Sequence, residues 1–302
     1  MDYRLRHTAV LLSQVSLCVL AYAQSKGGSA TLPHVEHHKD ALGSYAIVST
    51  TNYLHSPLLE ALLAVNQEYG WAVSFEDVPT VNPSEIVDSE PELHRKHPEL
   101  TGTNVANDAP YSSKFPEIAP QQANIAAVLQ QIVADYNATN NHGKFKVVRS
   151  IKGNFAIVGY EYHDTSGKQT LFVSPLECLI TVEIRPANIF DAMRAVVDSV
   201  NTTCGGAGVY KIDARENVPD PSFGPMEQVS GSYVAVSARN IMMDLLSQLH
   251  EKAYYSIFFG PVDNYFGLNT WGATRNFVDR SGKVIPKPVP NPGIGMEESE
   301  QP

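Results

Sequence analysis

One helix pattern recurs along this chain and constrains its fold more than any other feature. Asn124, Asn188 and Asn240 each precede an isoleucine, with further apolar residues near +5 and +8, so each is expected to cap a helix with one apolar face. Ser56-Pro57 opens a similar helix earlier in the chain, and Gly70 is suited to end it. The recurrence indicates duplicated units, although unrelated amphipathic helices also resemble one another.

Short apolar or alternating segments flank these helices and are typical of strands. Lys152-Gly153-Asn154 joins two of them as a hairpin turn. The expected strands cover residues 45–50, 71–75, 145–151, 155–162, 179–184, 209–212, 232–237, 254–259 and 265–269. This order predicts an α+β fold of two related modules, residues 43–165 and 170–275, each with two helices on one face of a small mixed sheet.

Three segments lack this order. Residues 24–42 are polar and are expected to form a flexible lead-in. Residues 79–120 contain seven prolines and many charges, which is typical of a long excursion from the first module. Residues 283–302 combine alternating prolines with an acidic run, and we expect a disordered tail there.

The predicted order also places two cysteines together. Cys178 precedes the strand at 179–184, and Cys204 follows the helix that begins at Asn188. Because that helix runs back along its strand, both cysteines are expected at the same end of the module. A disulfide between them would stabilise the fold by roughly 3 kcal/mol, whereas the alternative is two separately buried thiols.

The N-terminus has the three parts of a secretory signal peptide. Arg4 and Arg6 provide the positive charge, an apolar run follows, and Ala21-Tyr22-Ala23 supplies small residues for cleavage before Gln24. Residues 1–23 are therefore predicted to be removed. The alternatives are a membrane anchor, for which the apolar run is short, and lipidation of Cys18, which lacks the small residue usual before it.

Export sets the charge and compartment of the mature protein. The net charge of −10 becomes −11 when Arg4, Arg6 and Asp2 are removed. An acidic chain repels phosphate backbones, so nucleic acid is not expected as a partner. No second apolar run is long enough to span a membrane. We therefore expect a soluble periplasmic or secreted protein without a transmembrane anchor.

Common catalytic motifs are absent from the sequence. It contains no phosphate-binding glycine loop, no Gly-x-Ser-x-Gly, no His-Glu-x-x-His and no Cys-x-x-Cys. No cofactor is therefore predicted, and no catalytic residue can be named. Asn137-Ala-Thr139 and Asn201-Thr-Thr203 match the N-glycosylation pattern, which matters only in a eukaryotic secretory pathway.

Two clusters are candidate binding residues. Imidazole and carboxylate groups suit zinc, nickel or copper, and His34, Glu36, His37 and His38 form a dense set of such ligands. Incidental surface histidines are the alternative, since a firm site needs fixed geometry. An aromatic hairpin could bind a partner or a sugar by stacking, or its rings could fill a core; its candidate residues are Tyr254, Tyr255, Phe258, Tyr265 and Trp271.

The segment from Pro57-Leu58-Leu59-Glu60-Ala61-Leu62-Leu63 to Gly70-Trp71-Ala72-Val73-Ser74-Phe75 resembles the short N-terminal domains of secretins and TonB-dependent receptors. Both have an apolar helix, a glycine and an alternating strand. The resemblance covers about 20 residues and implies a periplasmic docking module without catalysis. No barrel-forming segments follow it here.

The sequence is therefore interpreted as an exported protein with a non-catalytic binding or assembly role in the cell envelope or medium. Its expected partner is an envelope or extracellular protein, and its oligomeric state is not specified. Two alternatives stay open: a secreted, hydrolase-like enzyme without a linear motif, and metal binding through the N-terminal histidines.

Overall fold

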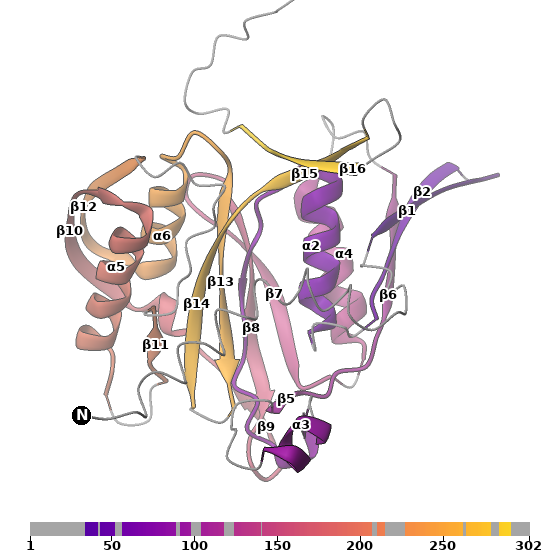
Figure 1. The fold of residues 1–302 in the computed structure, drawn as a ribbon, viewed down its shortest axis with the longest axis horizontal. Helices are drawn as coiled ribbons and strands as arrows, with labels where there is room; N and C mark the ends of the chain where they lie inside the picture. Colours follow the sequence, from indigo (N-terminus) through magenta and orange to yellow (C-terminus); the bar gives the residue numbers. More distant parts are fainter. Residues whose placement is uncertain are drawn as a thin grey trace, which may run out of the picture.

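The computed structural model describes residues 34–290 except 42, 52–55, 89–90, 98–103, 118–123, 140, 207–209, 215–226, 262–263 and 279–283. Helices and sheets alternate in five layers, with one large sheet in the middle (Figure 1). The α+β class is confirmed. The predicted signal peptide, residues 1–23, lies outside the described residues.

The central sheet combines strands from both ends of the chain. Its order is β11-β14-β13-β3-β8-β7, with β9 also paired to β8. The pairs β11–β14, β13–β3 and β3–β8 are parallel, and the hairpin pairs are antiparallel. The strands are β3 (Ser74–Glu76), β7 (Gly143–Arg149), β8 (Phe155–His163), β9 (Gln169–Leu171), β11 (Ile212–Asp213), β13 (Ala253–Gly260) and β14 (Tyr265–Gly272).

Helices cover both faces of the central sheet, as Figure 1 shows. Helices α2 (Pro57–Tyr69) and α4 (Ile125–Asn137) lie on one face, and α5 (Ile189–Thr203) and α6 (Ala238–Leu246) lie on the other. Successive side chains of β8 point to opposite faces of the sheet and so enter two hydrophobic cores. Ile157 packs with α2 and α4, while Ala156 and Val158 pack with α5 and α6.

A small antiparallel sheet closes each helix layer from outside. One has the order β1-β2-β6, and the other pairs β10 with β12. These strands are β1 (Val35–Asp40), β2 (Gly43–Ser49), β6 (Ser112–Pro116), β10 (Leu179–Asn188) and β12 (Gln228–Ser237). Each helix pair is therefore buried between two sheets, which explains why the helices carry so many fully buried apolar residues.

Three of the four predicted helix starts are confirmed: α2 begins at Pro57 after Ser56, α4 after Asn124 and α5 after Asn188. The side chains of Asn124 and Asn188 accept hydrogen bonds from the backbone N–H three residues on. Gly70, in the left-handed region at φ 64°, ends α2 as expected. The prediction for Asn240 is wrong, because α6 is capped by the Ser237 hydroxyl and Asn240 lies inside the helix.

The same pairing pattern occurs twice along the chain. In the first half β2 pairs with β6, β3 with β8, and β7 with β8; in the second β10 pairs with β12, β11 with β14, and β13 with β14. Corresponding pairs have the same relative direction. The two halves nevertheless contribute to one sheet and place their helices on opposite faces, where the sequence predicted a separate sheet for each.

The three irregular segments contain more structure than expected. The excursion at 79–120 holds the 3-10 turn η1 (Pro83–Glu85), β4 (Ile86–Asp88), α3 (Pro91–Lys96), β5 (Asn104–Ala106) and β6. In the expected flexible lead-in, residues 35–40 form β1, which pairs with β2. In the expected disordered tail, β16 (Val284–Pro288) pairs with β15 (Thr274–Val278). Residues 24–33 and 291–302 lie outside the described residues.

The predicted disulfide between Cys178 and Cys204 is confirmed, with a Cα–Cα distance of 6.2 Å. Cys178 follows the short turn η2 (Pro175–Glu177), at the start of β10, and Cys204 caps the end of α5. The return of the helix along its strand brings them together, as the sequence order predicted. The bond ties the α5 layer to the outer sheet.

Candidate functional site: a cavity where the two halves meet

A cavity of about 160 Å³ lies where the two halves of the chain meet. We call it the junction cavity. Five segments line it, and most of its wall is apolar. The lining residues are Trp71, Ala72, Val73, Ile125, Gly153, Asn154, Phe155, Leu246, Ser247, Lys252 and Ala253.

Local backbone geometry places the aromatic walls of this cavity. The left-handed Gly70 ends α2 and turns the chain, so that Trp71 stacks on Tyr69 with ring centroids 4.7 Å apart. Gly153, at φ 90°, forms the tight β7–β8 turn that presents Phe155 on the other side. Trp71 is buried and Phe155 half-buried, so the walls are supported from behind by the core.

Among the described residues that line the cavity, Lys252 is the only charged one. It lies directly before β13, where its ammonium donates one hydrogen bond to the Gly70 carbonyl oxygen at 3.1 Å. Within the described part of the chain it forms no ion pair, and burial lowers the pKa of its ammonium. An ammonium has three donors, so two of them can serve a ligand. Lys252 is thus a half-buried cation in an acidic protein, with no counter-charge among the described residues.

A buried ionic network joins the halves at the centre of the molecule. Both carboxylate oxygens of Glu76 on β3 accept from Arg239 on α6, at 2.6 and 2.7 Å. Tyr255 and Ser174 donate to the same carboxylate, at 2.6 and 2.5 Å. A third Arg239 donor reaches Glu177. Because these groups satisfy one another, the network holds the two halves together.

A second buried network fixes the excursion against the body. His142, just before β7, lies 2.8 Å through Nδ1 from Asp108 and 3.5 Å through Nε2 from Asp77. Burial lowers the pKa of His142, but the charge and hydrogen bond of Asp108 outweigh it and raise the pKa to about 10. Tyr136 donates to the same Asp108 at 2.6 Å. The imidazolium thus neutralises a carboxylate that would otherwise be buried alone.

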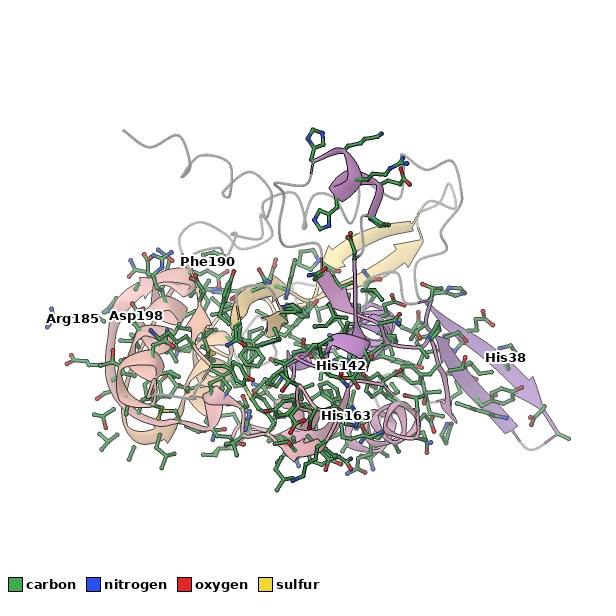
Figure 2. The ribbon with its side chains drawn as sticks, turned by 90° about the horizontal axis from the view of Figure 1, so that it is seen from below. His38, His142, His163, Arg185, Phe190 and Asp198 are labelled. Atoms are coloured by element: carbon green, nitrogen blue, oxygen red, sulfur yellow. A yellow bond between two sulfur atoms is a disulfide. The ribbon has the colours of Figure 1, made fainter. Side chains whose placement is uncertain are left out.

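The N-terminal ligand candidates lie on the projecting β1–β2 hairpin, far from this network; Figure 2 shows His38 there and His142 in the body. Strand alternation divides the set. Glu36 is 3.4 Å from both His34 and His38, whereas His37 contacts Glu68 of α2 at 3.1 Å. In residues 34–290 as described, no group of three or more potential ligands is arranged to hold a metal.

The candidate aromatic residues of the β13–β14 hairpin differ in exposure. Tyr254 and Tyr255 are buried, and the Tyr255 hydroxyl belongs to the Glu76 network, so neither ring offers a surface to a partner. Phe258 is half-buried beside Phe75. Tyr265 and Trp271 are also half-buried, and the Trp271 indole donates to Ser256.

Sequence reasoning missed the junction cavity. Its residues are spread over five segments and match no motif. The one usable signal was a lysine directly before the apolar run of β13. Comparison with family models, curated proteins and solved structures gives no match for this chain. Among the described residues, no helix is long and apolar enough to cross a membrane.

Proposed function

We propose that this chain is an exported, non-catalytic binding protein that holds a small organic anion in the junction cavity. The observation that carries the proposal is Lys252, a half-buried cation at the edge of an apolar cavity. Ligand sites are characteristically concave, mostly apolar and provided with a few polar groups that orient the ligand.

The cavity dimensions define the ligand. An apolar cavity of about 150 Å³ holds a molecule the size of benzene. The junction cavity has a similar volume but is open to solvent on one side, and its rim carries one ammonium. The fitting ligand is therefore a carboxylate with a compact ring or short branched chain, whose apolar body lies against Trp71 and Phe155 and whose charge meets Lys252.

Fluorescence titration tests this function. Trp71 and Trp271 are the two tryptophans, so a Trp271→Phe variant reports on the cavity wall alone. Titration with phenylacetate should shift Trp71 emission saturably, and phenylacetamide, which has the same shape without the charge, should bind about tenfold more weakly. No saturable change with any member of a panel of compact carboxylates would reject the cavity as a binding site.

The alternative of a hydrolase-like enzyme has less support. Two described groups with raised pKa values, His142 and Tyr255, lie inside the buried networks and are bonded to Asp108 and Glu76 rather than facing an open cavity. A screen of the mature protein with ester and amide substrates distinguishes the two functions. Turnover lost in Lys252→Met but retained in Lys168→Met, a change at an exposed lysine, would favour the enzyme.

Export and duplication belong to the same proposal. A free N-terminus at Gln24 in secreted protein, measured by mass spectrometry, would establish cleavage, whereas a chain starting before Cys18 would contradict it. The repeated pairing pattern supports descent of the two halves from one module. An envelope or extracellular protein partner, the secretin-like docking role and metal binding through His34, Glu36, His37 and His38 stay predictions; metal analysis of tag-free protein checks the last.

A further inference from the structure

At each edge of the central sheet, one asparagine side chain occupies the outward-facing backbone groups of one strand residue. On β7, the Asn137 side chain accepts from the Phe145 N–H at 2.9 Å and donates to the Phe145 carbonyl oxygen at 2.8 Å. On β11, Asn201 does the same to Ile212, at 3.0 and 2.7 Å. Each asparagine lies near the C-terminal end of a helix and occupies both backbone groups of one edge residue. We call these contacts the asparagine clamps.

A third asparagine shows what happens where the clamp is loose. Asn66 lies near the C-terminal end of α2, before β3, as Asn201 lies before β11. It makes one long contact of 3.5 Å to the Val73 carbonyl oxygen, and its own Oδ1 has no partner in the described structure. Two residues after Val73, β13 has joined the sheet beside β3, pairing Ser256 with Phe75 and Ile257 with Glu76. The loose clamp coincides with strand addition.

The repeated pairing pattern makes the two outer edges complementary. In that pattern β7 corresponds to β13, and β11 corresponds to β3. The parallel junction of β13 with β3 inside one chain is therefore a template for β7 of one copy beside β11 of another. Such an interface is head-to-tail, so it continues from copy to copy instead of closing in a symmetric pair.

We propose that the two edges of the central sheet are interaction surfaces for a second copy of this chain, kept closed by the asparagine clamps of Asn137 and Asn201. Each clamp occupies the donor and acceptor that an added strand needs. The internal junction of β13 with β3 contains only two residue pairs. One clamped residue at an outer edge is therefore enough to prevent a similar junction from forming there. This inference does not depend on the junction cavity.

Alanine substitutions test the geometry. Asn137→Ala opens only the β7 edge and Asn201→Ala only the β11 edge, so each variant alone should stay monomeric in sedimentation velocity. Mixing them should give a 1:1 complex of twice the monomer mass. The double variant carries both open edges and should form longer species that grow with concentration. Asn240→Ala, inside α6 and away from both edges, is the matched control and should stay monomeric.

Several results would overturn the proposal. Circular dichroism first establishes that each variant keeps the wild-type spectrum. Self-association of either single variant would indicate symmetric or non-specific pairing, and a folded equimolar mixture that stays monomeric would show that the edges are not complementary. If the alanine variants unfold, Asn137→Leu and Asn201→Leu provide a second set, since leucine keeps a similar side-chain size and removes both the acceptor and the donor of the clamp. A folded mixture of these that stays monomeric would equally reject the proposal.

Discussion

Replacing His142 with glutamine should destabilise the protein in a pH-dependent way. The imidazolium is buried between Asp108 and Asp77, and its pKa is raised from 6.5 to about 10. At about 1.4 kcal/mol per pH unit, this difference corresponds to roughly 5 kcal/mol of folding free energy. Because the folded-state pKa is the higher one, this stabilisation is complete below pH 6.5 and is lost as pH rises toward 10.

The assay is urea unfolding of wild type and variant at pH 6, 7, 8, 9 and 10, with the disulfide intact. The difference in unfolding free energy should be about 5 kcal/mol at pH 6 and should shrink steadily to near zero at pH 10. His163→Gln is the control, because the ion pair between His163 and Glu85 is partly exposed to solvent. This substitution should lower the unfolding free energy by less than about 1 kcal/mol. A His142 effect that is independent of pH would refute the reasoning.

Two further predictions concern the cross-links between elements. Replacing Cys178 and Cys204 with serine should lower the unfolding free energy by about 3 kcal/mol in urea titrations, and an unchanged midpoint would contradict it. Arg239→Met should cost about 3–5 kcal/mol because it leaves Glu76 charged and buried. Adding Glu76→Gln to that variant should recover part of the loss, since the buried charge is gone; a double variant less stable than Arg239→Met would show that the pair is not coupled.

Local signals made much of the fold predictable. Asn124 and Asn188 mark helix starts because an asparagine before apolar residues at helical spacing commonly caps a helix, its side chain accepting a hydrogen bond from a backbone N–H of the first turn. Asn240 misled because the actual cap, Ser237, ends a strand that runs directly into its helix. The disulfide followed from the order of one strand and one helix. All these inferences depend on residues close together in the chain.

Long-range pairing could not be predicted in the same way. β3 has only three residues, and its central position depends on β13, which lies about 180 residues later. β1 contains two histidines and three charged residues, so its composition hides a strand that pairing with β2 stabilises. Lys252 and Trp71 line the same cavity only because β13 pairs with β3. The junction cavity therefore leaves no pattern in the sequence.

The most direct test of the binding function compares acid and amide ligands on two proteins. Affinities of phenylacetate and phenylacetamide are measured by calorimetry at pH 7 for wild type and Lys252→Met, with Lys168→Met as control. Wild type and the control should prefer the acid about tenfold, and Lys252→Met should bind both ligands weakly and equally. An acid preference that survives loss of the Lys252 ammonium would contradict it.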